Sequence, residues 1–229
     1  MIEKQKNDIM IEIKDYKDKH EYISDKGVKS VVYLMDCMDL LKQIPDKYFE
    51  LAIIDPPYRD MKDNQPTKDM RSNGQMDKFG NKPCNEYFDI LFKISLNQII
   101  WGANNFSLPN YKGFVVWEKL SISENFTMSM AELAFISEGL GTTSKIYKII
   151  PQDKQKIHPT QKPVALYEWL IKHYAKEGDK ILDTHLGSGS SRIAAYKANL
   201  PFMGCELDAD YFYASVKRFE NETKQLRLL

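Results

Sequence analysis

The hydrophobic positions of this chain follow two spacings that alternate along the sequence. Short apolar runs rich in β-branched residues predict buried strands, and apolar residues three or four positions apart predict amphipathic helices. The apolar runs predict strands at residues 31–35, 51–54, 98–101, 113–117, 131–136, 180–183 and 202–205. The helical spacing predicts helices at residues 39–44, 85–95, 163–174, 190–198 and 210–219. Strands that alternate with helices predict an α/β fold with a mainly parallel, doubly wound sheet.

Three stretches depart from this alternation. A polar segment, rather than a long helix, joins the strands at 113–117 and 131–136, which favours an antiparallel pair at one edge of the sheet. Residues 1–25 are highly charged, and we interpret them as an N-terminal extension that is either frayed or an added edge strand. Residues 26–229 are then a single domain. Within it, the polar stretches 59–83 and 137–158 are candidate functional loops.

Composition narrows the class of protein. The chain has 229 residues, of which 43% are hydrophobic and 28% charged, as is typical of a globular protein outside the membrane. No run is long and uncharged enough for a membrane span, and the first residues lack the apolar core of a signal peptide. The three cysteines (Cys37, Cys84, Cys205) are far apart, which argues against disulfides or a metal site and for the cytoplasm.

The most informative stretch is the sequence Asp55-Pro56-Pro57-Tyr58, which directly follows the apolar run 51–54. The two prolines end the strand, because neither can donate a hydrogen bond to a sheet. A carboxylate, a stiff turn and an aromatic ring are thereby presented at the carboxyl end of a strand, where ligands bind in open α/β sheets. The plain structural alternative is a strand and a turn in which Asp55 caps a helix and Tyr58 packs at the rim.

This cluster suits chemistry on an aromatic amine. The lone pair of such an amine is delocalised into its ring, so the free base is a poor nucleophile. Asp55 and the carbonyl of Pro56 are positioned to accept the two amine hydrogens, which localises the lone pair. The ring of Tyr58 offers a face on which an extruded base stacks.

A second constellation lies near the end of the chain. Residues 179–208 form a predicted strand, a Gly187-Ser188-Gly189 turn, a helix and a second strand that ends at Glu206. This is half of a nucleotide-binding fold, in which the acid at the second strand binds ribose hydroxyls. The sequence lacks a full Gly-x-Gly-x-x-Gly and any phosphate-binding Gly-Lys-Ser/Thr, so a ligand with ribose but no phosphate, S-adenosylmethionine, fits best.

These two motifs, with His158-Pro-Thr-Gln-Lys-Pro163 between them, resemble the DNA amino-methyltransferases. The resemblance is to the permuted (beta) group, in which the catalytic motif precedes the cofactor motif, and it covers residues 31–219. It implies a Rossmann-like sheet with strand order 3-2-1-4-5-7-6 and an antiparallel strand 7. It also implies transfer of a methyl group from S-adenosylmethionine to a flipped-out base. Asp at the first position of the catalytic motif is typical of adenine N6 enzymes.

The resemblance also implies roles for individual residues. The catalytic motif comprises Asp55, Pro56, Pro57 and Tyr58. Implied for the cofactor are Asp36 and Cys37 at its adenine, His158, Thr160 and Lys162 over its methionine tail, Asp183, Gly187, Gly189 and Ser190 under that tail, and Glu206 at its ribose. No metal is expected. Where the family has Pro-Phe after Asp183, this chain has Thr184-His185, and we assign His185 no catalytic role.

DNA contacts must come from local patches, because the net charge is zero. Little sequence remains for a recognition domain, so base reading is expected from the 59–83 loop, the basic stretch before residue 158, or a second subunit, as in a homodimer. The basic candidates are Arg59, Lys62, Lys145, Lys148, Lys154 and Lys156, for which a solvated surface is the plain alternative.

Two classes of rival function remain. One is methylation of another planar amine, namely cytosine N4, an RNA adenine or a protein glutamine, although glutamine enzymes usually have Asn where Asp55 stands. The other is a catalytically silent DNA-binding subunit of a methyltransferase complex. Such subunits tend to lose the acid or the aromatic residue of the motif, and this chain keeps both.

Overall fold

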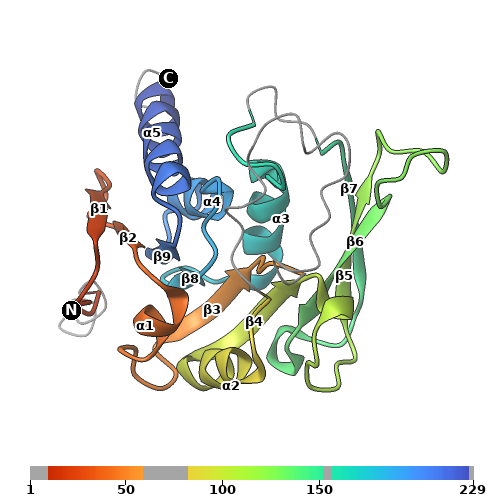
Figure 1. The fold of residues 1–229 in the computed structure, drawn as a ribbon, viewed down its shortest axis with the longest axis horizontal. Helices are drawn as coiled ribbons and strands as arrows, with labels where there is room; N and C mark the ends of the chain where they lie inside the picture. Colours follow the sequence, from red (N-terminus) through yellow and green to blue (C-terminus); the bar gives the residue numbers. More distant parts are fainter. Residues whose placement is uncertain (1–9, 59–81, 152–155, 227–229) are drawn as a thin grey trace.

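A computed structural model describes residues 10–58, 82–151 and 156–226, with side chains up to residue 224 (Figure 1). Within these residues nine strands form one sheet in the order β1-β2-β9-β8-β3-β4-β6-β5-β7. The strands are β1 (Asp18–Ile23), β2 (Lys29–Leu34), β3 (Phe49–Ile54), β4 (Ser95–Trp101), β5 (Phe114–Lys119), β6 (Ala131–Ile136), β7 (Lys145–Ile149), β8 (Ile181–Asp183) and β9 (Phe202–Glu206). The helices are α1 (Cys37–Leu41), α2 (Asn85–Ile94), α3 (Val164–Tyr174), α4 (Ser190–Lys197) and α5 (Ala209–Leu226), with 3-10 turns η4 (Ala103–Asn105) and η5 (Glu138–Leu140).

The middle of the sheet is parallel. Strands β2, β9, β8, β3 and β4 run in one direction, so their carboxyl ends meet at one edge. After β8 the chain crosses to β9 on one side, and after β3 it crosses to β4 on the other. The position between β8 and β3 is therefore a topological switch point, where α/β sheets form a ligand crevice.

The strand order confirms the sequence-based expectation over seven strands. The seven strands β2-β9-β8-β3-β4-β6-β5 lie side by side in the expected order. Within them, β6 is antiparallel to both of its neighbours, β4 and β5. β1 and β7 extend this sheet at its two edges.

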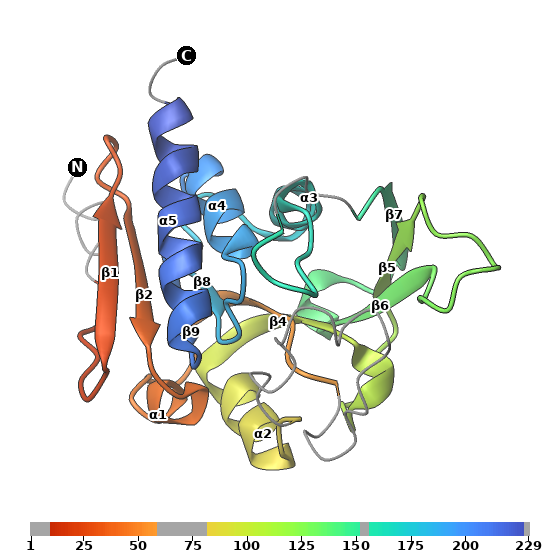
Figure 2. The ribbon, with the colours of Figure 1, turned by 45° about the horizontal axis from the view of Figure 1, so that its top comes forward.

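Helices cover both faces of the sheet (Figure 2). On β3, Ala52 and Ile54 pack towards α1 and α2. Leu51 and Ile53 point the other way, into a core shared with α3, α4 and α5. This alternation divides the apolar interior into two layers and explains why the strand reads as a continuous hydrophobic run.

One expectation about the ends of the sheet needs correction. The stretch 137–158 is not simply a loop, because it contains η5 and the edge strand β7. Of the two interpretations of the N-terminal extension, the structure shows the added edge strand, which is Asp18–Ile23 and pairs with β2. Ile13 is buried in the core, so the described part of the extension, from residue 10, packs on the same sheet. No helix in the described ranges is long and apolar enough to cross a membrane.

Arg192 ties the N-terminal strand to the rest of the fold. Its guanidinium is buried over the ring of Phe219, 3.9 Å from the centroid. It donates to Ser30 Oγ and faces His20 Nδ1, each at 2.9 Å. Burial lowers the pKa of Arg192 to about 9. His20 therefore lies in a partly buried polar junction, and its Nε2 lies 3.4 Å from Glu220.

Candidate functional site

The catalytic motif forms a tight cluster at the end of β3. The phenol of Tyr58 donates to Asp55 Oδ1 at 2.6 Å. Its ring fits against the left-handed turn at Gly102, where an added Cβ would overlap the ring. Gly102 directly follows β4, so the neighbouring strand supplies the space that Tyr58 occupies.

A buried network of charges surrounds Asp55. The ammonium of Lys162 lies 2.5 Å from Asp55 Oδ2 and 2.9 Å from Glu132 Oε2. The other oxygen of Glu132 pairs with Lys119 at 2.5 Å. Lys162 also lies over the rings of Tyr58 and Trp101. Two lysines thus balance two carboxylates in a water-poor site, which is the condition under which buried charges are tolerated.

The two carboxylates respond differently to this network. Burial raises the pKa of Asp55, and the single facing ammonium of Lys162 does not offset it. Burial acts on Glu132 too, but Lys162 and Lys119 together lower its pKa to about 2. Burial disfavours the ammonium of Lys162, yet the two acids more than compensate and raise its pKa. Burial, with Asp55 adding to it, raises the pKa of Tyr58, so Tyr58 remains a phenol and a donor.

The glycine turn lies at the same edge of the sheet, after β8. Gly187 and Gly189 have φ values of 50° and 73°, in the left-handed region that favours glycine. The backbone N–H of Gly187 donates to Glu206 Oε2 at 2.8 Å, and Oε1 of the same carboxylate accepts from Leu207 and Asp208. Glu206 therefore fixes the turn against the end of β9. Three of its roughly four acceptor positions are used, which leaves one for a hydroxyl group.

The segment 158–163 connects this turn to the catalytic cluster. The hydroxyl of Ser190 donates to the carbonyl of Lys162 at 2.7 Å, while the ammonium of the same lysine binds Asp55. The ring of His158 lies over Gly187 and against Tyr211. Burial and then Lys162 lower the pKa of His158 to about 4, so the ring is neutral at pH 7. Thr160 is exposed, with its hydroxyl 3.1 Å from His158 Nδ1.

The remaining predicted cofactor residues border the same edge. Asp36 caps α1 by accepting from the N–H of Met38 at 2.7 Å, and the thiol of the adjacent Cys37 has its pKa raised to about 12, chiefly by burial. Asp183 is buried and accepts from Ser191 Oγ and from the N–H of His185. Burial raises the pKa of Asp183 to about 7.

These residues fit a ribose-bearing cofactor. A glycine turn with left-handed backbone, a carboxylate at the end of the adjacent strand and a neutral ring over the turn lie together at the switch point. His185 lies against Tyr87 at 5.4 Å between ring centroids, which agrees with a packing role.

Of the predicted DNA-contacting residues, the structure describes Lys145, Lys148 and Lys156. Arg59, Lys62 and Lys154 lie outside the described residues. Lys145 and Lys148 are both on β7, but their three-residue separation puts them on opposite faces of the strand. Lys148 pairs with Glu118 at 2.8 Å, and Lys156 is exposed.

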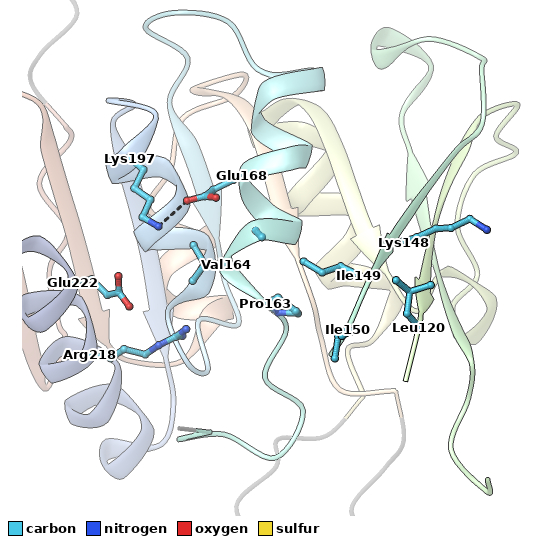
Figure 3. Close-up of a pocket in the computed structure, with 11 residues that line it drawn as sticks. Leu120, Lys148, Ile149, Ile150, Pro163, Val164, Glu168, Lys197, Arg218 and Glu222 are labelled. Carbon is cyan, nitrogen blue, oxygen red and sulfur yellow. Dashed lines mark ion pairs between the residues drawn. The ribbon is translucent and has the colours of Figure 1, made fainter. Parts of the chain in front are cut away.

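A pocket of about 580 Å³ lies beside the start of α3, away from Asp55 (Figure 3). Its wall is mixed: the exposed apolar Leu120 and Ile150 face a Lys197–Glu168 ion pair. Neither the catalytic motif nor the glycine turn lines it. Arg218 on its wall donates to the Ser188 carbonyl and to Ser190 Oγ, which supports the turn from behind.

Sequence reasoning missed two members of the charge network, Glu132 and Lys119. Glu132 lies near the start of β6, which is otherwise apolar, and Lys119 follows Glu118 at the end of β5. A charged residue in such a strand is the available signal, because a buried charge requires a partner. Lys162 was expected over the cofactor, and the structure adds its contact with Asp55.

Comparison with known proteins agrees with this geometry. The profile of the N6_N4_Mtase family, described as DNA methylase, matches residues 116–217. The chain is 26% identical over 202 residues to the putative methylase YubD of Escherichia coli (strain K12), an alignment that covers 80% of this chain and 87% of that protein.

Solved structures share the fold. The complex of M1.HpyAVI with SAM superposes with a TM-score of 0.56 at 20% identity, covering 82% of this chain and 97% of that one. The cytosine-N4-specific PvuII DNA methyltransferase gives 0.57 at 15% identity, covering 84% and 89%. The fold is thus a Rossmann-like methyltransferase fold. In sequence over residues 116–217, and in fold over 82% of its length, the chain is thus similar to DNA methyltransferases, one of them solved in complex with SAM.

The raised pKa of Asp183 predicts a pH-dependent stability. A carboxyl group whose pKa rises on folding, here from about 4 to about 7, stabilises the fold fully below pH 4, and this contribution is lost as the pH rises through 7. Relative to Asp183→Asn, the free energy of unfolding of the wild type should fall by about 2–4 kcal/mol between pH 4 and pH 8. Urea unfolding without cofactor measures it. A difference that is constant with pH would contradict the buried carboxyl.

The Gly102 turn predicts a second effect. Gly102→Ala should displace the ring of Tyr58 and reduce methyl transfer by at least about tenfold, because a ring shifted by about 1 Å no longer orients its partners. Gly178→Ala is the matched control, since Gly178 also has positive φ (84°) but an added Cβ meets no atom within 4 Å. Both variants carry the same backbone strain. Equal losses of activity in the two would refute the assigned role of the turn.

Proposed function

We propose that this protein transfers the methyl group of S-adenosylmethionine to the N6 amine of adenine in DNA. The observation that carries the proposal is the position of Asp55. Its buried carboxylate lies at the same sheet edge as the glycine turn, and Lys162 joins the two. When bound, the cofactor supplies an electrophilic methyl group on a positively charged sulfur.

In this proposal the residues of the turn after β3 orient the target amine. Asp55 accepts one amine hydrogen and the Pro56 carbonyl the other, which localises the nitrogen lone pair. Tyr58 is held by its bond to Asp55 and borders the position of the flipped base. The water-poor surroundings strengthen these hydrogen bonds.

The cofactor would be held by the turn at Gly187 and Gly189, by Glu206 and by the segment at His158. Asp36 and Cys37 at the start of α1 are proposed for its adenine. In chain order the catalytic strand β3 precedes the cofactor strand β8, which supports assignment to the permuted group. DNA contacts are proposed for the basic residues at β7 and Lys156, and for the 59–83 stretch.

Cytosine N4 is the second candidate target, since PvuII DNA methyltransferase, a structural neighbour, is cytosine-N4-specific. The acid at position 55 favours adenine. Incubation of the protein and S-adenosylmethionine with genomic DNA from a host without adenine methylation decides between them. Mass spectrometry of the digested nucleosides should show N6-methyladenine. N4-methylcytosine alone, or no methylated base, would overturn the adenine assignment.

Asp55→Ala tests the catalytic assignment. Removal of the carboxylate should abolish turnover, by at least about 10³-fold, because the amine loses the acceptor that orients it. Binding of S-adenosylmethionine, measured by calorimetry, should stay within about threefold of wild type. Asp46→Ala is the control, since Asp46 forms an exposed ion pair with Lys93. Retained activity in Asp55→Ala at wild-type folding would refute the role of Asp55.

A further inference from the structure

Glu132 provides a second hydrogen-bond acceptor for Lys162 and Tyr58, the two groups that donate to Asp55. Lys162 Nζ lies 2.5 Å from Asp55 Oδ2 and 2.9 Å from Glu132 Oε2. Tyr58 Oη lies 2.6 Å from Asp55 Oδ1 and 3.3 Å from the same Glu132 oxygen. Neither donor must travel far to exchange one carboxylate for the other.

This matters because each oxygen of Asp55 already accepts from a strong donor in the structure. One oxygen accepts from Tyr58 and the other from Lys162, so an arriving amine shares its acceptor with a donor that is already bound. The ammonium of Lys162 also draws negative charge away from the oxygen on which the amine depends. A buried ammonium that leaves its carboxylate is strongly destabilised unless a second acid receives it.

We propose that Glu132 is a positioning residue that takes over Lys162, and with it the Tyr58 phenol, when the target amine binds Asp55. The inference rests on the proposed function, because a planar amine must be the group that displaces Lys162. No covalent bond forms or breaks in this exchange, and the protons stay on Lys162 and Tyr58. Lys119 holds the other oxygen of Glu132, so the acid is already oriented to receive Lys162.

Charge balance supports this exchange. Two ammonium groups and two carboxylates are present before and after it, so the site stays neutral while Asp55 is released. The backbone of Lys162 need not move, because Ser190 holds its carbonyl. The glycine turn therefore stays in place while the ammonium of Lys162 changes its partner from Asp55 to Glu132.

The titratable groups around Asp55 come from four helices and strands and from the segments that carry Tyr58 and Lys162. Lys162 and Tyr58 bind it directly and Glu132 faces it from β6. Tyr167 on α3 and Asp183 at the end of β8 also interact electrostatically with Asp55. Lys119 on β5 influences Asp55 indirectly, because it pairs with Glu132. Loss of Lys162 alone leaves two acids facing each other across the site, which raises the pKa of Asp55 further.

The test is a double-mutant cycle of Glu132→Gln and Lys162→Met, with single-turnover methylation of genomic DNA measured across pH. Glu132→Gln leaves Lys162 bound to Asp55 alone, so the methylation rate should fall at least about tenfold while cofactor affinity stays within about threefold. Lys162→Met should move the acidic limb of the pH–rate profile to higher pH. The double variant should be at least about fivefold faster than Glu132→Gln, because nothing then competes for Asp55.

Glu50→Gln is the matched control. Glu50 also pairs with a partly buried lysine, Lys180, but at the start of β3, away from Asp55, and its loss should leave the rate unchanged. If Glu132→Gln does not fold, the comparison moves to the Lys162→Met background. There the added Glu132→Gln change should not slow the reaction further, since Glu132 acts through the lysine.

Three results would overturn the proposal: a wild-type rate in Glu132→Gln, a double variant no faster than Glu132→Gln, or a further loss of rate in the Lys162→Met background. The wild-type arm reports separately on the proposed function. If wild type makes N4-methylcytosine, the adenine assignment fails and the same cycle tests Glu132 on the cytosine amine. If wild type methylates no base, the proposed function fails, and the exchange, which requires an amine, fails with it.

Discussion

Lys162 is bound at both ends, and the geometry of the site depends on this. Its carbonyl accepts from Ser190 at the start of the helix after the glycine turn, and its ammonium bridges Asp55 and Glu132. One residue therefore links the glycine turn after β8 to the turn at Asp55 after β3. The register between β3 and β8 brings the two turns to the same edge of the sheet, and Lys162 joins them there.

This arrangement places charged groups in the interior, where each must be paired, and neighbouring strands and segments supply the partners. Lys119 and Glu132 come from the antiparallel pair β5 and β6, while Asp55 and Lys162 come from the parallel half of the sheet and its crossover. The reversed strand β6 thus brings an acid to the edge where β3 ends. Removal of Lys162 leaves Asp55 without an ammonium partner, and removal of Glu132 leaves Lys119 without an acid, so these two substitutions are expected to act beyond their own contacts.

Much of the fold was predictable because local patterns and tertiary structure agree. The run before Asp55 and the run before Asp183 both predicted buried strands, and both are central in the sheet. Their motifs also predicted the two turns of the site. The edge strand β7 was not predicted and β1 was only one of two alternatives for the extension, since polar residues alternate with apolar ones in both strands. The contact between Lys162 and Asp55 spans 107 positions, and no local pattern encodes a pairing at that distance.

The most direct test of the account is a crystal structure of the protein with S-adenosylmethionine bound. We expect the cofactor on the turn at Gly187, with its methyl group directed at Asp55 across a gap that admits one amine nitrogen. A methyl group that faces away from Asp55, or a cofactor on the other side of the sheet edge, would contradict the account.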